Sequence, residues 1–515
     1  MSRSTLQIHL REVSFQYDSA ASAIFTRVTT QFEPGFTGVV GANGAGKSTL
    51  LQLISGELKP DSGQIDGTGD LIHCAQRTDD PPRRFSELME DDDGATYALR
   101  ARLGVEYDFL ERWHHLSHGE RKRAQIATAL WQAPDALTID EPTNHIDSAA
   151  RELLLDSLRQ FRGVGIIVSH DRALLDELCS HTLWLDGPEP VLYTGGYSKA
   201  KQQREQDQIS LQHERDSLRR SQKKLDQEVV KRREKAARSH KDRSKSGLAI
   251  KDHDARYKKN LARNSGKDGQ AGRLLNQLGG RKEQLDQKLG NIEVNKQRSV
   301  GIWLEGSKAR KQTLINVPEM KLPMGIDRFL KTPPLVMQPA ARIAVTGANG
   351  TGKSTLLTAL QPEFNVPDEH LIFMPQEISA VDSRKLLAEA KSLGNDELGK
   401  LMTIVSALES DPKRMLDSEQ PSPGEIRKIL LAMGILREPW LIVMDEPTNH
   451  LDLPSIEALE QALAECPCGL LLVSHDQDFL ASLATIEWHL SDSGNHSELQ
   501  IQHKRPGVNE AKLNL

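Results

Sequence analysis

Short apolar runs that end in glycine-rich or acidic residues recur in the first and the last part of this 515-residue chain. In the first part they occupy residues 37–40, 136–139 and 165–168. In the last part they occupy residues 342–345, 441–444 and 470–473. Apolar and β-branched runs of this length predict buried strands. The pattern therefore predicts an α/β fold with a parallel sheet in each half of the chain.

The residues that follow these runs are nearly the same in both halves. The segment 41–49 reads Gly-Ala-Asn-Gly-Ala-Gly-Lys-Ser-Thr and returns, with one change, at 347–355. Both copies fit the P-loop pattern G-x-x-x-x-G-K-[ST]. An acidic pair followed by Pro-Thr-Asn-His, and a later Ser-His-Asp, also occur twice. The offsets are 306 residues for the P-loop lysines (353 − 47) and 305 for the histidines (475 − 170), which indicates a duplicated nucleotide-binding domain.

The P-loops are the expected sites of ATP. Each would cradle the phosphates with backbone N–H groups at the start of a helix, where the helix dipole favours anions. The lysine of each loop would place a cation on the γ-phosphate. The candidate ATP-binding residues are Gly41, Asn43, Gly44, Gly46, Lys47, Ser48 and Thr49 in the first copy, and Gly347, Asn349, Gly350, Gly352, Lys353, Ser354 and Thr355 in the second.

The acidic pairs and histidines supply candidates for Mg²⁺ binding and for catalysis. Hydroxyl, carboxylate and amide oxygens suit Mg²⁺, and the candidates near the metal are Ser48, Asp140 and Gln76 in the first copy and Ser354, Asp445 and Gln376 in the second. Glu141 and Glu446 are placed to orient or deprotonate the attacking water. His170 and His475 could bond the γ-phosphate and sense its loss. Each glutamine could equally be an ordinary surface residue.

A different pattern occupies residues 197–300. Leucines recur every seven residues at 211, 218 and 225, and the spacing returns at 271, 278, 285 and 292. Two heptad-like helices around a glycine-containing segment predict an antiparallel helical hairpin. Residues 231–280 hold 15 Lys and Arg against 5 Asp and Glu, although the whole chain carries −6. The tip is expected near residues 239–272. A solvated charged tether is the plain alternative, but it would not need paired heptads.

The cysteine content and the lack of long apolar runs predict the compartment in which the protein works. The four cysteines are scattered, and Cys466-Pro-Cys468 has no second ligand pair nearby. We therefore expect neither a zinc site nor a disulfide framework, and a reducing, cytoplasmic setting. No signal-peptide pattern and no apolar run of about 18 residues is present, so no membrane span is predicted.

Residues 116–120, Leu-Ser-His-Gly-Glu, and 421–425, Pro-Ser-Pro-Gly-Glu, each precede a basic helix. Both resemble the LSGGQ signature of ATP-binding cassette (ABC) proteins. The resemblance covers nearly the whole chain and implies two P-loop NTPase (ABC ATPase) domains, at 1–196 and 301–515, joined by the basic hairpin. It also implies a head-to-tail sandwich of the two domains within one monomer. Ser422 and Gly424 would then complete the first ATP site, and Ser117 and Gly119 the second.

The Ser-Pro-Gly-Glu signature, the repeated Asp-Glu-Pro-Thr-Asn-His and the charged linker resemble the ABC-F branch in particular. That resemblance implies an ATPase that binds the ribosome near the tRNA exit site. The linker tip would reach toward the peptidyl-transferase centre, rRNA and the P-site tRNA. Basic side chains between 231 and 259 suit this role, because they neutralise phosphates without reading sequence. The spacings from Gln76 to Ser117 and from Gln376 to Ser422 leave no room for the extra arm of some members.

Adenine contacts are less defined by the sequence. Tyr17 resembles the aromatic residue that stacks on the base in the first site, although a core or surface tyrosine would fit the same position. Trp303 is a candidate in the second copy, but it lies fifty residues before Lys353.

Several functions stay open at the level of sequence. An ATP-binding subunit of a transporter would need a separate membrane partner and no long basic hairpin. Within ABC-F, protection of the ribosome against antibiotics and regulation of translation are both possible, and drug resistance with and without the gene would separate them. Salt-dependent binding to free RNA or DNA would favour a role outside the ribosome.

Overall fold

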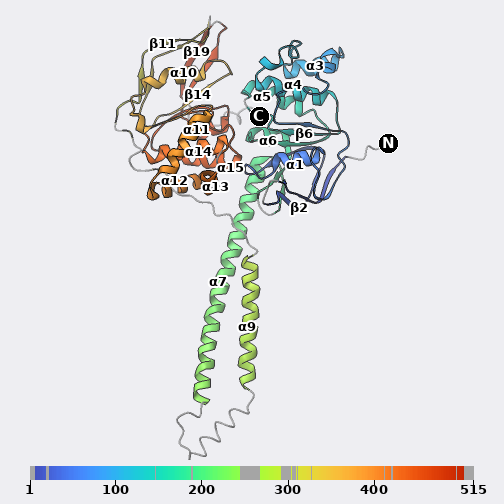
Figure 1. Cartoon of the computed structure of the whole chain (residues 1–515), viewed down its shortest axis with the longest axis vertical. Coiled ribbons are helices and arrows are strands. Elements are labelled where there is room, and N and C mark those ends of the chain that lie inside the picture. Colours follow the sequence, from blue (N-terminus) through green and yellow to red (C-terminus); the bar gives the residue numbers. More distant parts are fainter. Residues whose placement is uncertain are drawn as a thin grey trace, which may run out of the picture. The chain divides into compact units, whose positions relative to one another are not determined.

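The computed structural model describes residues 6–18, 22–144, 146–186, 189–243, 267–290, 303, 309, 311–325, 328–410, 412–418, 421–494 and 496–503. The chain divides into two compact units, one of Met1–Ala200 with Arg298–Leu515 and the other of Lys201–Gln297. The first unit holds both halves with the repeated motifs, and the second holds the helical linker (Figure 1).

A six-stranded sheet with the order β5-β6-β7-β3-β8-β9 lies at the centre of the N-terminal half. All neighbours in it are parallel except β8 and β9. Every residue of β6 and β7 is buried, as the apolar runs predicted. The strands are β3 (Gly35–Val40), β5 (Leu71–Cys74), β6 (Ala136–Asp140), β7 (Val164–Val168), β8 (Cys179–Trp184) and β9 (Val191–Thr194).

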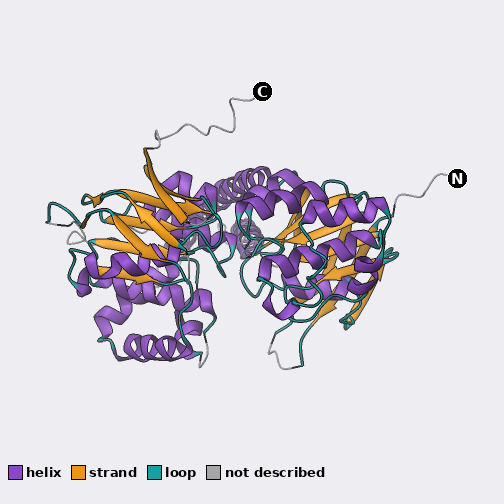
Figure 2. Ribbon diagram, turned by 90° about the horizontal axis from the view of Figure 1, so that it is seen from above, coloured by secondary structure: helices purple, strands orange, loops and turns teal. Residues whose placement is uncertain are grey.

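An antiparallel sheet, β2-β1-β4, and a set of helices complete this half. Its strands are β1 (Ile8–Phe15), β2 (Phe25–Phe32) and β4 (Ser62–Asp66). The helices are α1 (Lys47–Ile54), α2 (Phe85–Glu90), α3 (Gly94–Leu103), η1 (Trp113–His115), α4 (His118–Trp131), α5 (Ser148–Leu158) and α6 (Arg172–Leu178). Strands and helices form separate layers (Figure 2), and their apolar side chains make two buried clusters on this half.

The C-terminal half repeats the same central sheet with added strands. Its order is β11-β12-β19-β18-β14-β17-β16-β15, and β10 pairs with β13 in a separate two-stranded sheet. The strands are β10 (Ile315–Val317), β11 (Met320–Pro323), β12 (Phe329–Thr332), β13 (Leu335–Met337), β14 (Arg342–Gly347), β15 (Leu371–Met374), β16 (Leu441–Asp445), β17 (Gly469–Val473), β18 (Ile486–Asp492) and β19 (His496–His503).

Helices of this half pack on the sheet as in the first half (Figure 2). They are α10 (Lys353–Leu360), η3 (Gln361–Glu363), η4 (Asp368–His370), α11 (Ala380–Ser392), α12 (Asn395–Ala407), α13 (Pro412–Asp417), α14 (Pro423–Leu436), α15 (Leu453–Ala464) and α16 (Gln477–Leu483). The predicted α/β fold of two P-loop domains is thereby confirmed.

The two halves place their motifs alike. The order β5-β6-β7-β3-β8 in one corresponds to β15-β16-β17-β14-β18 in the other. Because these strands are parallel, their carboxyl ends meet at one edge, where α/β proteins bind ligands. Each half therefore gathers its P-loop, its acidic pair and its histidine at that edge.

The second unit is a pair of long helices, α7 (Tyr197–Arg243) and α9 (Lys267–Gly290), which lie side by side (Figure 1). Lys282 Nζ lies 2.6 Å from Asp226 Oδ1, and Gln222 Nε2 donates to Asp286 Oδ1 over 2.5 Å. As the residue number rises on one helix it falls on its partner, so the helices are antiparallel, as the heptads predicted. The predicted tip, at 239–272, lies largely outside the described residues.

The heptad leucines differ in their burial. Leu278 is 6% exposed, whereas Leu211 is 40% exposed. The observed register places Leu211 opposite residue 297, which lies beyond the end of α9 and outside the described residues. Over the described parts of the two helices, the leucines of the heptads are therefore not uniformly buried.

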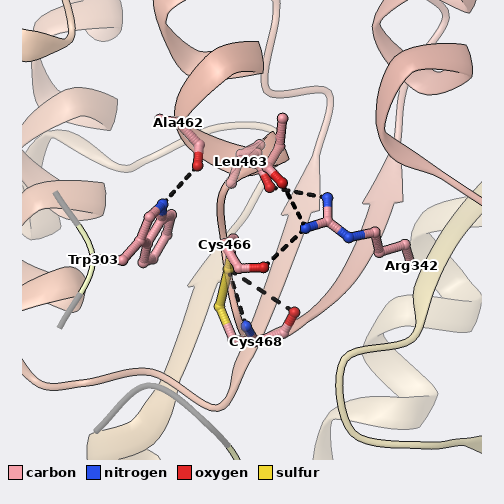
Figure 3. The surroundings of a disulfide bond; sticks show 7 residues. Trp303, Arg342, Ala462, Leu463, Cys466 and Cys468 are labelled. Atoms are coloured by element: carbon pink, nitrogen blue, oxygen red, sulfur yellow. Dashed lines mark hydrogen bonds between the residues drawn. A yellow bond between two sulfur atoms is a disulfide. The ribbon is translucent and has the colours of Figure 1, made fainter. Parts of the chain in front are cut away.

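The prediction that the cysteines form no disulfide is wrong. Cys466 and Cys468 form a disulfide (Figure 3), while Cys74 and Cys179 are free and buried. The turn between α15 and β17 brings the two Cα atoms to 5.5 Å, within the range that a disulfide spans. Arg342 Nη2 donates to the Cys466 carbonyl over 2.8 Å. The sequence showed only the short spacing and not the turn that joins the two thiols.

Candidate ATP-binding sites

The first P-loop connects β3 to α1, and its backbone conformation needs glycine. Gly46, the residue before α1, has a φ of 94°, which side chains with a Cβ rarely adopt. A Cβ there would also lie 2.5 Å from Ile24 Cγ2. Lys47 is 8% exposed, and its Nζ donates to the carbonyls of Gly41 and Ala42 over 2.8 and 3.1 Å. The ammonium group therefore lies inside the loop where phosphates would bind.

The second P-loop, between β14 and α10, repeats this arrangement. Gly352 has a φ of 96°. Lys353 Nζ donates to Gly347 and Ala348 over the same distances of 2.8 and 3.1 Å. Burial lowers the pKa of both P-loop lysines, and nearby carboxylates oppose that shift. A phosphate in either loop would meet a poorly hydrated cation, which strengthens the attraction.

The acidic pairs lie at the ends of β6 and β16 and are buried. Glu141 and Glu446 are each 5% exposed, and their φ angles of 46° and 49° are left-handed. Backbone strain of this kind in residues with a Cβ is concentrated at functional sites. Burial, followed by the charge of Asp140, raises the pKa of Glu141 to about 8. Burial raises the pKa of Glu446 to about 7. Both carboxylates are therefore more basic than an exposed glutamate.

Each histidine lies beside the glutamate of its own half. His170 Nε2 is 3.1 Å from Glu141 Oε1, and His475 Nε2 is 3.5 Å from Glu446 Oε1. Burial, aided by the P-loop lysine, lowers the pKa of His170 to about 3 and that of His475 to about 4. Both rings are neutral near pH 7. A neutral ring keeps one N–H donor, which suits a bond to a γ-phosphate oxygen.

The residues expected near Mg²⁺ fit such an ion in the second half. Ser354 Oγ donates to Asp445 Oδ2 over 2.9 Å. In the first half, Asp140 Oδ1 is buried and accepts no hydrogen bond, so a further polar group there would satisfy it. No cluster of three His, Cys, Asp or Glu ligands exists among the described residues. Mg²⁺ does not need one, because it takes few protein oxygens together with water and phosphate.

Gln76 and Gln376 follow β5 and β15 by two residues, and both are exposed. Since β5 pairs with β6 and β15 with β16, each glutamine lies on the same edge as its acidic pair. This placement permits the expected contact with Mg²⁺ or water. Both side chains remain candidates for binding Mg²⁺ or its water.

The signature serines begin helices α4 and α14. Ser117 and Ser422 are N-caps, and each forms a capping box with the glutamate three residues later. Glu120 Oε2 accepts from the Ser117 N–H over 2.8 Å, and Glu425 Oε2 from the Ser422 N–H over 2.7 Å. The glutamates that replace the signature glutamine thus satisfy backbone donors at the helix start. Gly119 and Gly424 are buried in the first turn of these helices.

Residues of one half reach the P-loop of the other. The Asn43 N–H donates to Asp452 Oδ2 over 2.5 Å, and Asn43 Nδ2 donates to the His450 carbonyl over 3.2 Å. A Cβ on Gly424 would lie 2.7 Å from that same carbonyl oxygen. The second signature therefore lies next to residues that touch the first P-loop. In the other direction, the Asn349 N–H donates to Asp147 Oδ2 over 3.3 Å.

The aromatic candidates are placed differently. Tyr17 OH lies 3.1 Å from Thr49 Oγ1, so this tyrosine is beside the first P-loop helix. Trp303 Nε1 donates to the Ala462 carbonyl over 2.6 Å (Figure 3). Trp303 therefore packs on α15, and the suggestion that it stacks on adenine lacks support. In the second half, the side chain of Met324 lies close to the second P-loop, since its sulfur would be 2.7 Å from a Cβ on Gly352.

Two basic residues at these sites have no motif and were missed. Lys122 on α4 is fully buried, and its Nζ donates to the carbonyls of Ala75 and Asp140 over 2.7 and 2.8 Å. Arg427 occupies the equivalent position on α14 and donates to the carbonyls of Glu446 and Asn449 over 2.8 and 2.7 Å. The repeat offset of 305 residues (427 − 122) would have matched them.

Comparison with known proteins agrees with this geometry. The model of the family described as ABC transporter matches residues 25–144 and 330–449, one in each half. The chain belongs to the ATP-binding cassette family. It is an ATPase with two cassettes, and each match includes a P-loop and its acidic pair.

Relatives match the chain over most of its length. The ribosome protection protein VmlR of Bacillus subtilis (strain 168) is 27% identical over 525 residues, which covers 97% of this chain and 90% of VmlR. The tylosin resistance ATP-binding protein TlrC of Streptomyces fradiae is 27% identical over 538 residues, covering 92% of this chain and 95% of TlrC. These relatives are ABC-F proteins, so the predicted branch is confirmed.

A third relative is named for translation and not for resistance or ribosome protection. The energy-dependent translational throttle protein EttA of Haemophilus influenzae is 27% identical over 555 residues, covering 92% of this chain and 90% of EttA. Among solved structures, the RNase-L inhibitor matches with a TM-score of 0.63 at 19% identity, covering 97% of this chain and 92% of that one. That structural match supports the tandem-cassette fold. None of the described helices combines the length and apolar composition needed to cross a bilayer.

Proposed function

We propose that this tandem-cassette ATPase acts on the ribosome in the cytoplasm, binding it with ATP and leaving it after hydrolysis. The observation that carries the proposal is the exchange of contacts between the cassettes. Asp452 meets the first P-loop and Asp147 meets the second. ATP held between a P-loop and the opposite signature would therefore stabilise one arrangement of the cassettes, and hydrolysis would remove that stabilisation.

Equivalent side chains would bind the phosphates and Mg²⁺ in the two sites. Lys47 and Lys353 would bind the γ-phosphate, and the helix-capping Ser117 and Ser422 would bind it from the opposite cassette. Bound Mg²⁺ would neutralise charge on the β- and γ-phosphates. Ser48 and Ser354 would bind the metal directly, while Asp140, Asp445, Gln76 and Gln376 would hold it or its water.

Hydrolysis needs a positioned water. Glu141 and Glu446 are buried bases with raised pKa values, suited to orient water and accept its proton. The neutral His170 and His475 would donate to the γ-phosphate and lose that bond when it leaves. The cycle would then time how long the ribosome-binding arrangement lasts.

The linker is the proposed contact with rRNA and the P-site tRNA. Its described helices are polar and charged on their outer faces, and Lys231, Arg232 and Arg233 lie on α7. Basic side chains on such a hairpin would neutralise RNA phosphates. The names of the relatives support a ribosomal partner, since VmlR is a ribosome protection protein.

Sedimentation of the Glu141→Gln/Glu446→Gln protein with ribosomes tests the proposal. We expect co-migration with ribosomes when ATP is present and little without it, because the variant binds ATP but does not hydrolyse it. The same protein with Lys47→Met and Lys353→Met added is the control and should not co-migrate. Absence of ATP-dependent co-migration, with ATP bound, would reject the ribosomal function and direct attention to a membrane partner or another nucleic acid.

Antibiotic protection is the more specific candidate within this function. TlrC is named for tylosin resistance and VmlR for ribosome protection. Minimum inhibitory concentrations of ribosome-targeting antibiotics should rise when a sensitive host expresses this chain. Unchanged values, together with ATP-dependent ribosome binding, would favour regulation of translation.

A further inference from the structure

A line of contacts runs from the first P-loop to the root of the linker within the N-terminal cassette. The Ala42 N–H donates to Asp186 Oδ1 over 2.7 Å. The other oxygen, Asp186 Oδ2, accepts from Trp184 Nε1 over 2.7 Å. The Trp184 ring stacks on Tyr197, with centroids 5.6 Å apart and planes inclined by 24°. Tyr197 is 1% exposed and is the first residue of α7.

A second line of contacts returns from Tyr197 to the same P-loop through the C-terminal cassette. Tyr197 OH donates to Glu457 Oε1 over 2.7 Å. Glu457 lies on α15, whose N-cap is Asp452. Asp452 caps that helix through the Ser455 N–H and also accepts from the Asn43 N–H of the first P-loop. The two lines form a closed ring, and Tyr197 is the residue at which they meet.

Helix α15 also contacts the N-terminal cassette and a residue that follows the linker in the chain. Leu453 is 1% exposed and belongs to the core of the N-terminal cassette. Arg172 Nη2 donates to Glu460 Oε2 over 2.7 Å. The carbonyl of Ala462, in the last turn, accepts from Trp303 Nε1, as Figure 3 shows. Trp303 follows the linker in the chain, so residues at both ends of the linker bond to one helix.

The corresponding helix of the N-terminal cassette is not used in this way. Asp147, the N-cap of α5, contacts the second P-loop over 3.3 Å. Glu152 on α5 is the counterpart of Glu457 by the repeat offset of 305 (457 − 152), and it is exposed. The described contacts of the first residue of α7 thus lead through Glu457 and α15 to the first P-loop.

We propose that Tyr197 and helix α15 couple the ATP site at the first P-loop, and not the site at the second, to the position of the linker. This inference rests on the proposed function in one respect, that ATP moves the linker. A shift of Asp452 against the first P-loop moves α15, and α15 holds Tyr197 through Glu457. The same shift reaches Tyr197 through Asp186 and Trp184. Tyr197 is a positioning residue, since it acts through Glu457 and Trp184.

Distances between spin labels test the coupling without any ribosome. One label is placed on α2 by Ser86→Cys and one on α7 by Ser221→Cys, both at exposed positions. Electron-spin distance measurements are made with and without a non-hydrolysable ATP analogue. We expect Tyr197→Phe to keep the analogue's affinity and to lose most of the analogue-induced distance change. A full change in Tyr197→Phe, or no change in the parent protein, would overturn the proposal.

Further variants separate coupling from folding. Glu457→Gln keeps an oxygen that can accept from Tyr197 and should retain the distance change, whereas Glu457→Leu should lose it. Tyr97→Phe, at a tyrosine that is 59% exposed on α3, is the matched control and should behave as the parent. Equal melting temperatures of the Tyr197→Phe and parent proteins would exclude loss of folding as the cause.

The choice of site is tested by blocking one P-loop at a time. Lys47→Met should abolish the distance change, and Lys353→Met should leave it. Equal effects of the two substitutions would refute the assignment to the first site. Because ribosomes are absent, loss of the coupling and loss of ribosome binding are read out independently.

Discussion

At the scale of residues, the two sites share their motif side chains and differ in what supports them. Lys122 and Arg427 are equivalent by the repeat. Lys122 donates to the carbonyl of Asp140, beside Glu141, and Arg427 donates to the carbonyl of Glu446. Burial lowers the pKa of Lys122 to about 8, whereas arginine stays charged at any ordinary pH. The guanidinium also reaches the Gln376 carbonyl. Arg427 therefore donates to three backbone carbonyls of its site, whereas Lys122 donates to two.

Substitution of Lys122 by methionine should destabilise the first cassette. It leaves the carbonyls of Ala75 and Asp140 without their donor, and hydrogen bonds to charged groups contribute about 1.5–3 kcal/mol each. We expect a lower melting temperature in scanning calorimetry. Lys59→Met, at an exposed lysine of the same cassette, is the control. Equal melting temperatures of the two variants would show that Lys122 does not support the site.

Replacement of Glu141 and Glu446 by glutamine should stop turnover while ATP stays bound. Glutamine matches the shape of glutamate but cannot accept the proton of water, and a general base contributes about 10²–10⁴-fold. The measurements are phosphate release and binding of a fluorescent ATP analogue. Glu152→Gln, at an exposed position on α5, should have no effect. Turnover retained in the double variant would assign the base elsewhere.

At the scale of elements, one helix start has a structural role in the fold and a proposed role in ATP binding. Ser422 is the N-cap of α14 and forms a capping box with Glu425. In the proposed role of the signature, the same serine would also bind a phosphate. The N-cap explains why serine and glutamate stand at these positions in both copies. It does not by itself show a contact with ATP, so the two roles must be separated by substitution.

Two substitutions of Ser422 separate them. Ser422→Ala removes the cap, which costs about 1 kcal/mol, whereas Ser422→Asp keeps a good N-cap. We expect a lower melting temperature for alanine and a nearly unchanged one for aspartate. ATPase activity should fall in both, because aspartate brings a negative charge toward the γ-phosphate.

The control for this pair is Ser379, which caps α11 through the Asp382 N–H and lies outside the motifs. Ser379→Ala should lower the melting temperature and leave ATPase activity unchanged. If Ser422→Asp has the activity of the parent protein, the signature serine has no part in ATP binding.

At the scale of the whole molecule, the hairpin and the cassettes form separate compact units. The polar pairs Asp226–Lys282 and Gln222–Asp286 hold α7 against α9. Both pairs lie outside residues 236–270, so removal of that segment leaves them in place. The cassettes bury their own cores, which makes them independent of the tip.

Deletion of residues 236–270 should leave the basal ATPase rate nearly unchanged and remove its stimulation by ribosomes. The tip would contact RNA, whereas the P-loops and acidic pairs lie in the cassettes. Phosphate release with and without ribosomes is the measurement. A second variant keeps the length and replaces the Lys and Arg of 236–270 by Gln, and it should behave as the deletion does. Loss of the basal rate would show that the tip supports the cassettes.

Much of the fold and of each site could be predicted from the sequence. The apolar runs became β3, β6, β7 and their repeats, and the motifs came together at the ends of those strands. The P-loop glycines have the left-handed backbone that only glycine adopts readily. These features depend on a few consecutive residues whose local backbone and charge requirements are visible in the chain.

Only the tertiary structure decided which distant residues meet. Asn43 and Asp452 are 409 residues apart, and Tyr197 and Glu457 are 260 apart. No local pattern encodes such pairs, because they depend on how whole elements pack. The Cys466–Cys468 disulfide was also set by a turn, the one between α15 and β17. The sequence thus determined two ATP sites and a helical hairpin, while packing decided which of those sites is connected to the hairpin.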